Sequence, residues 1–189
     1  MRIVAGRNRG RAILAPEGID IRPTADRARQ AVFDLLAHSP DMPERLLAEA
    51  RVLDAFAGTG AMGLEALSRG APHCTFLDRD QRAIAGLRAN AQTLNELSRA
   101  SFLRADALQP PPAAQPVGLA FLDPPYGKNL CMPALKALAD AGWFAPGAIV
   151  VVEHDSAEAL EDLPGFQDIG ARRYGRAQFL FLRHGEAAP

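Results

Sequence analysis

The chain has 189 residues, of which 48% are hydrophobic and 23% charged. This composition suits a globular domain with a sizeable core and excludes a disordered chain. No apolar run approaches the roughly 20 residues that span a bilayer, and no apolar stretch follows the first arginines, so we expect neither a membrane protein nor a secretory leader. Two cysteines are too few for a disulfide framework, which favours a cytoplasmic location.

Charge is divided unevenly along the chain. The formal net charge is −1, but residues 1–29 hold seven arginines against three acids, and the remaining residues hold 14 basic and 19 acidic side chains. A basic arm on an acidic body fits a protein that contacts phosphates with one part and holds a cation in the other. A solvated arginine-rich terminus explains the charge equally well, so both interpretations stay open at this point.

The first elements of the chain are short. Residues 2–15 are typical of two short strands around a glycine-containing turn, which predicts a hairpin. Apolar residues at helical spacing then predict a helix over 24–36, followed by a linker at 39–43.

From residue 51 onward, short apolar strands alternate with helices, a pattern that predicts a parallel sheet covered on both faces. The final two strands lie so close in sequence that they must pair antiparallel. The expected strands are 52–56, 74–77, 101–103, 117–122, 148–152, 165–174 and 178–183, and the expected helices are 62–69, 80–95 and 130–140.

A glycine loop joins the first strand of this sheet to its helix. Gly58, Gly60 and Gly63 form a G-x-G-x-x-G pattern, and Asp78 lies 20 residues after Gly58. This pattern alone would equally indicate a nicotinamide-binding domain. Asp54, however, precedes the glycines, where it would repel a pyrophosphate but attract the sulfonium and ammonium groups of S-adenosylmethionine.

Acids also follow the next two strands, as Asp78 and Asp106. Ligands of open α/β sheets bind outside the carboxyl ends of the strands. Each acid could be a solvated loop residue or a helix cap, as we expect for Asp80, but together they suit the parts of one nucleoside ligand. The candidate cofactor-binding residues are Asp54, Phe56, Ala57, Gly58, Thr59, Gly60, Asp78, Arg79, Asp106, Ala107 and Asp123.

The tetrapeptide Asp123-Pro124-Pro125-Tyr126 follows the apolar strand 117–122 and supplies the candidate catalytic residues. It could be an ordinary stiff turn. If its strand lies beside the first one, however, Asp123 lies next to the glycine loop. The Asp123 carboxylate and the Pro124 carbonyl could then accept hydrogen bonds from an exocyclic base amine. Pro125 would fix the turn, and Tyr126 would offer a face for an extruded base.

The segment from Gly58 to Arg69 and the tetrapeptide resemble the bacterial 16S rRNA guanine-N2 methyltransferases of the RsmD type. So do three N-terminal segments, Met1–Gly6, Arg9–Arg11 and Arg22–Arg27, so that the similarity covers nearly the whole chain. In two places the chain differs from the familiar pattern, with Asp78 in place of a Glu and Tyr126 in place of a Phe.

The resemblance implies a Rossmann-like α/β fold, a seven-stranded sheet of order 3-2-1-4-5-7-6 with the last strand antiparallel. It implies methyl transfer from S-adenosylmethionine, without a metal, to N2 of a guanine in 16S rRNA, within the small ribosomal subunit or its assembly intermediate. We further expect a monomer in which residues 1–40 form an RNA-contacting extension of a methyltransferase domain at 41–189. The candidate RNA-binding residues are Arg7, Arg9, Arg11, Arg22 and Arg27.

Other functions remain as alternatives. Enzymes that methylate adenine N6 or cytosine N4 share the tetrapeptide, and an RNA-binding assembly factor could retain the fold without catalysis; a dehydrogenase is the most distant alternative. The four histidines and two cysteines lack metal-like spacing. Cys131, Trp143 and Phe144 are expected to pack in the core.

Overall fold

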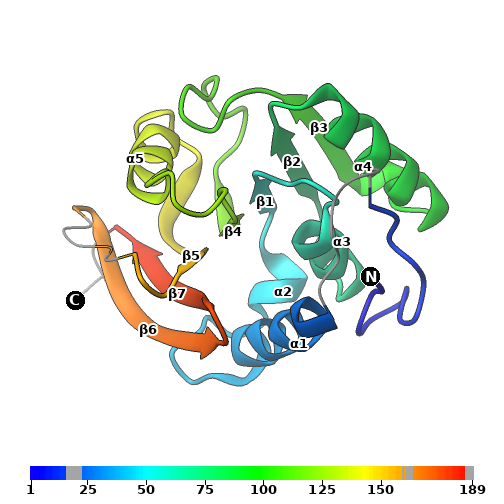
Figure 1. Cartoon of the computed structure of the whole chain (residues 1–189), viewed down its shortest axis with the longest axis horizontal. Helices are drawn as coiled ribbons and strands as arrows, with labels where there is room; N and C mark the ends of the chain where they lie inside the picture. Colours follow the sequence, from blue (N-terminus) through cyan, green and yellow to red (C-terminus); the bar gives the residue numbers. More distant parts are fainter. Residues whose placement is uncertain (16–22, 159, 161–163, 186–189) are drawn as a thin grey trace.

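The computed structural model describes residues 1–15, 23–158, 160 and 164–185. Its centre is a seven-stranded sheet of order β3-β2-β1-β4-β5-β7-β6 (Figure 1). The strands β1 to β5 are parallel, and β7 is antiparallel to both β5 and β6. The predicted fold class and strand order are confirmed. The strands are β1 Val52–Ala55, β2 Cys74–Asp78, β3 Ala100–Arg104, β4 Val117–Leu122, β5 Phe144–Asp155, β6 Phe166–Tyr174 and β7 Ala177–His184.

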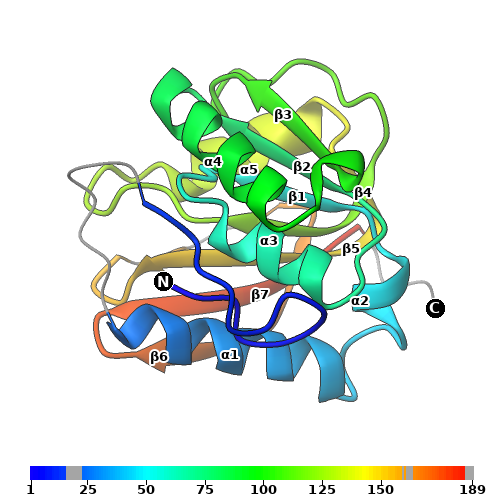
Figure 2. The ribbon, with the colours of Figure 1, turned by 90° about the vertical axis from the view of Figure 1, so that its right-hand side faces the viewer.

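Two apolar clusters cover the two faces of this sheet. Along β4, Leu119 and Phe121 belong to one cluster while Ala120 and Leu122 belong to the other, as the alternation of a doubly covered strand requires. Side chains of α1 to α4 contribute to the first cluster, and side chains of α5 contribute to the second. Figures 1 and 2 show where these helices lie. The helices are α1 Pro23–His38, α2 Leu46–Glu49, α3 Ala61–Ser68, α4 Gln81–Thr93 and α5 Cys131–Asp140, with a 3₁₀ turn at Leu97–Arg99.

Most predicted elements are confirmed to within two residues, but β5 is much longer than predicted. Pro146 and Gly147 suggest a strand that starts after them, yet Phe144 already pairs with Val117. The β4–β5 register then shifts before Ile149 pairs with Leu119. This irregularity tolerates a proline, which lacks a backbone donor, inside the strand. The short helix α2 was not predicted.

The predicted N-terminal hairpin is present, although its two segments are too short to form strands. Arg2 and Ala12 form an antiparallel bridge, and backbone hydrogen bonds join residues 1–3 to residues 10–13 around it. The turn of this hairpin also bonds to the body of the protein: the amide of Arg7 donates to the carbonyl of Ser68, and the side-chain amide of Asn8 donates to Glu96. Figure 2 shows this N-terminal arm, residues 1–15, running beside α3 and α1.

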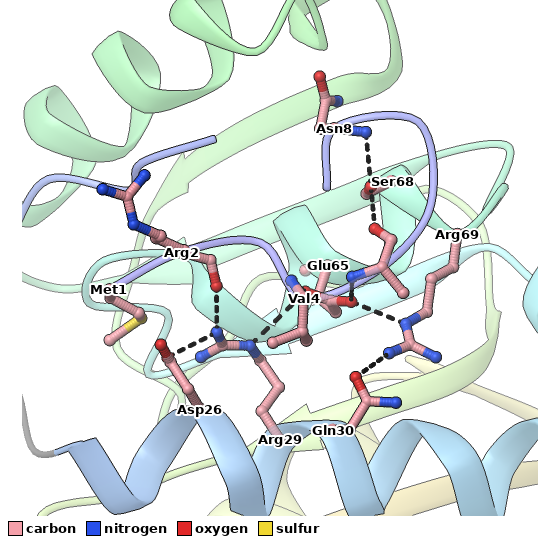
Figure 3. Close-up of polar contacts among 12 residues, drawn as sticks. Met1, Arg2, Val4, Asn8, Asp26, Arg29, Gln30, Glu65, Ser68 and Arg69 are labelled. Carbon is pink, nitrogen blue, oxygen red and sulfur yellow. Dashed lines mark hydrogen bonds and ion pairs between the residues drawn. The ribbon is translucent and has the colours of Figure 1, made fainter. Parts of the chain in front are cut away.

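The arm is attached through Glu65, a fully buried acid of α3 (Figure 3). Its carboxylate accepts hydrogen bonds from the amides of Val4, at 2.8 Å, and Ala5, at 3.0 Å. It also lies 3.7 Å from the Arg29 guanidinium of α1 and 2.7 Å from that of Arg69. One buried charge therefore joins the arm, α1 and α3, and its partners satisfy the hydrogen-bonding capacity that burial would otherwise leave unmet.

Gly6 is required for this attachment, and Gly10 provides a matched comparison. Both have left-handed backbones, with φ of +77° and +81°. A Cβ at Gly6 would lie 2.0 Å from the carbonyl oxygen of Ser68, whereas a Cβ at Gly10 would have nothing within 4 Å.

We therefore expect Gly6→Ala to lower the free energy of unfolding by about 3 kcal/mol, because the steric clash adds to the left-handed strain. Gly10→Ala should cost only about 1 kcal/mol, the strain alone. Urea unfolding followed by circular dichroism measures both changes. Equal losses would contradict the docking of the arm on α3.

Candidate active site

The turns that follow β1 and β4 lie side by side. Ala55 pairs with Leu122 at the ends of these strands, and the amide of Asp123 is 3.5 Å from the carbonyl oxygen of Ala55. The tetrapeptide that starts at Asp123 therefore abuts the glycine loop, as the predicted strand order required. Carboxyl ends of neighbouring parallel strands are the usual location of ligands in such sheets.

A cavity opens at these strand ends, between the turns after β1, β2, β3 and β4. It brings together six of the predicted cofactor-binding residues, while Ala57, Gly58, Thr59 and Gly60 form the adjoining loop. Asp54 does not line it. The lining consists of Phe56, Leu77, Asp78, Arg79, Ala105, Asp106, Ala107, Asp123 and Pro125.

Asp78 holds the glycine loop against β2. One carboxylate oxygen accepts a hydrogen bond from the amide of Gly58 at 2.9 Å, and the other accepts one from the amide of Asp80 at 2.8 Å. Asp80 itself caps α4, as predicted, since its side chain accepts from the amide of Arg82. The acid at the end of β2 thus both faces the cavity and fixes the loop beside it.

Asp54, in β1, holds the first turn of α3 beside the glycine loop. Its buried carboxylate accepts a 2.8 Å hydrogen bond from the amide of Gly63 in the first turn of α3. Gly63 is suited to this place because a Cβ would lie 2.3 Å from the ring of Phe76. Desolvation by burial, with repulsion from Asp78, raises the pKa of Asp54 to about 7, against the lowering effect of the Gly63 amide.

Phe56 lies at the wall of the cavity with an unusual backbone. Its φ is +59°, in the left-handed region that a residue with a bulky side chain rarely adopts. Such strain persists only where the surrounding structure imposes it, and it is concentrated at functional sites.

Asp123 also borders a second hollow, on the other side of the turn that follows β4. The rest of this hollow is lined by Met62, Phe121, Leu122, Val151, Glu153 and Phe179. The side chain of Asp123 is exposed toward these openings, but packed atoms displace water from the remainder of its surroundings. That desolvation, followed by repulsion from Glu153 and Asp54, raises the pKa of Asp123 well above its usual range.

The rest of the tetrapeptide forms the corner beside Asp123. Pro124 is buried, Pro125 is exposed at the cavity, and the hydroxyl of Tyr126 donates a 2.6 Å hydrogen bond to Glu153. Glu153 is a residue that our sequence analysis missed. The sequence does carry a signal for it. Glu153 directly follows the apolar run that ends at Val152, just as the other acids of the site follow apolar strands.

The predicted RNA-binding arginines are distributed over the N-terminal part of the chain. Arg7, Arg9 and Arg11 are exposed on the arm, and Arg27 is exposed on α1. Arg11 nevertheless donates to the carbonyl of Thr93. Arg22 lies outside the described residues.

The described residues contain no group of three or more His, Cys, Asp or Glu side chains that could hold a metal ion. They also contain no helix long and apolar enough to cross a membrane.

A sheet of this order, with a glycine loop and acids at the ends of its parallel strands, defines a class I methyltransferase. Within that class, the chain belongs to the family described as Conserved hypothetical protein 95, whose model matches residues 1–183. It is 34% identical to Ribosomal RNA small subunit methyltransferase D of Escherichia coli K12, across 87% of this chain and 79% of that one. The Haemophilus influenzae protein of the same name is 36% identical, across 85% and 81%. The solved structure of yhhF, a proposed methyltransferase of Escherichia coli, superposes with a TM-score of 0.81 at 29% identity and covers 99% of both chains.

The raised pKa of Asp54 predicts a specific dependence of stability on pH. The carboxyl ionises near 3.8 in the unfolded chain and near 7 in the folded one. Between these values the folded chain binds more protons, so the free energy of unfolding falls as the pH rises, and the loss is complete above the folded pKa.

Relative to Asp54→Asn, the wild-type chain should therefore lose about 4 kcal/mol of stability between about pH 4 and about pH 8. Urea unfolding at a series of pH values measures this difference. Asp140→Asn, at an exposed position on α5, is the control and should follow the wild-type curve. Parallel curves for wild type and Asp54→Asn would show that Asp54 ionises normally.

Proposed function

We propose that this chain transfers a methyl group from S-adenosylmethionine to the exocyclic N2 of a guanine in small-subunit rRNA. The observation that carries the proposal is the position of Asp123, which lines both the cavity beside the glycine loop and the hollow behind it. A methyl donor in the first and a base at the mouth of the second would meet at this side chain, which is exposed. The relatives named for methylation of small-subunit rRNA support the choice of substrate.

The lining of the cavity fits the proposed cofactor. Asp78 and Asp106 offer acceptors for ribose hydroxyls and an adenine amine, and Leu77, Ala105 and Ala107 offer apolar surface for the adenine ring. The acids also suit a ligand that carries a sulfonium and an ammonium, since opposite charges attract most strongly where water is displaced. When bound, the cofactor supplies the electrophilic methyl group.

In this proposal, Asp123 and Pro124 orient the amine that is methylated. The lone pair of an exocyclic base amine is delocalised into its ring, so the nitrogen is a poor nucleophile. Acceptors at its N–H bonds hold it in line and stabilise the positive charge that develops on it. Pro125 contributes no amide donor to compete for these acceptors, and Tyr126 supplies an aromatic face for the extruded base.

The substrate we propose is 16S rRNA within the small subunit or its assembly intermediate, in the bacterial cytoplasm, with the enzyme acting as a monomer. Residues 1–40 would contact the RNA, and residues 41–189 would form the methyltransferase domain. The exposed arginines at positions 7, 9, 11 and 27 support this division, because backbone phosphates dominate the affinity of proteins for nucleic acids.

The test of this proposal identifies the modified nucleoside. The protein is incubated with labelled S-adenosylmethionine and with undermethylated small subunits, naked 16S rRNA or duplex DNA, and the product is analysed by mass spectrometry. N2-methylguanosine from either rRNA substrate is the expected result. N6-methyladenine or N4-methylcytosine would assign the chain to the alternative amino-methyltransferases, and cofactor binding without transfer would indicate an assembly factor.

Asp123→Ala should separate catalysis from cofactor binding. We expect the turnover to fall by about 10²-fold or more, because the acceptor for the reacting amine is lost. Cofactor affinity, measured by calorimetry, should change only a few-fold, with Asp140→Ala as a surface control. Loss of cofactor binding would mean that Asp123 holds the cofactor and not the base.

Replacing Arg7 and Arg9 with alanine should weaken RNA binding and flatten its dependence on salt. Each lost phosphate contact should reduce the slope of log affinity against log salt by roughly 0.7 to 0.9. Arg45 and Lys136, which are exposed on other parts of the surface, provide a control double substitution with the same change in charge. Equal slopes for the two double variants would show that the arm does not contact phosphates.

A further inference from the structure

Two neighbouring strands, β4 and β5, have acids at or near their carboxyl ends that lie toward the same face of the sheet. In β4 and β5, Phe121 and Val151 belong to the cluster on the side of α1 to α4, and the residues two positions on, Asp123 and Glu153, lie toward that face too. Leu122 pairs with Val152, so Asp123 and Glu153 directly follow a paired position. Neighbouring strands are about 4.8 Å apart, which brings the two carboxylates close together.

The hollow between these acids has an apolar interior. Met62, Phe121, Val151 and Phe179 supply its walls, and Asp123 and Glu153 are the polar members of its lining. The hollow has a volume of about 10 Å³, which is room for about one water molecule. A base would therefore lie against its mouth, where Asp123 is exposed and Glu153 is half-buried. The hollow shares Asp123 with the cavity proposed for the cofactor.

Tyr126 fixes the orientation of Glu153. Its hydroxyl donates to one carboxylate oxygen, Oε1, at 2.6 Å. The guanidinium of Arg176 lies 5.9 Å from the centre of the Tyr126 ring and forms a 2.6 Å ion pair with Asp155.

We propose that Glu153 is a specificity-determining residue, which together with Asp123 recognises the adjacent N1–H and N2–H donors of the target guanine. This inference rests on the proposed function, since it explains why that enzyme would select guanine. In adenine and cytosine, the ring nitrogen beside the exocyclic amine is an acceptor, and its lone pair would face the carboxylate of Glu153. A site built to accept a hydrogen bond discriminates strongly against a ligand that lacks the donor.

The test replaces the N1–H donor of the substrate and leaves its N2 amine in place. Once the modified guanine has been mapped, rRNA with 2,6-diaminopurine at that single position is made by ligation of a synthetic segment. This base retains the 2-amino group but carries an acceptor at N1. The wild-type chain should methylate guanine with a kcat/KM at least about 10²-fold higher than diaminopurine.

Glu153→Gln should reverse part of this preference, because its amide can donate to the N1 acceptor while its oxygen still accepts from Tyr126. We expect the ratio of the two kcat/KM values to fall by about tenfold or more. Tyr126→Phe keeps the carboxylate but removes the hydrogen bond that orients it, so it should lower the ratio less than Glu153→Gln does. Glu49→Gln, at an exposed position on α2, controls for the change in charge.

The outcomes separate this inference from the function on which it rests. If the wild-type chain forms no N2-methylguanosine, the proposed function is wrong. If it methylates guanine and diaminopurine equally well, guanine methylation stands and the role of Glu153 is overturned, whether or not Glu153→Gln folds. An unchanged ratio in a folded Glu153→Gln protein would overturn it too.

Discussion

The burial of carboxylates at one edge of a sheet is the constraint on which this site depends. Desolvation, with repulsion from Asp78, raises the pKa of Asp54 to about 7. Desolvation, followed by repulsion from Glu153 and Asp54, raises the pKa of Asp123 well above its usual range. The unbound protein thus carries an electrostatic cost at this edge. A cationic cofactor and a base with N–H donors are the ligands that would relieve it, so the cost favours binding of the proposed substrates.

A second buried carboxylate, that of Glu65, binds the N-terminal arm, and this carboxylate has partners within the chain itself. Glu65 joins the arm to α1 and α3 through two backbone amides and two arginines. An apolar residue could fill the same volume, but it would not fix which amides face the helix. The arm is therefore held in one register, with Arg7 and Arg9 exposed on its outer side.

Much of this structure could be predicted from the sequence because its strands are short, apolar and separated by clear turn signals. The strand order and the proximity of Asp123 to the glycine loop followed from these signals and from the resemblance. The early start of β5 could not be predicted, since Pro146-Gly147 normally ends a strand and only the register shift against β4 accommodates it. The pairing within the arm was predicted, but its attachment to Glu65 and Ser68, which are about 60 residues distant, was not. Local spacing carries no information about such partners. Glu153 was missed because the predicted strand ended at Val152.

Because Asp123 lines both openings, its ionisation links them. A positive charge in the cavity beside Phe56 would favour the ionised carboxylate, and that form is the better hydrogen-bond acceptor for an amine in the other opening. Thermodynamic reciprocity requires the converse, that a donor at Asp123 strengthens binding of the cation by the same factor. The two ligands would thus bind with positive cooperativity.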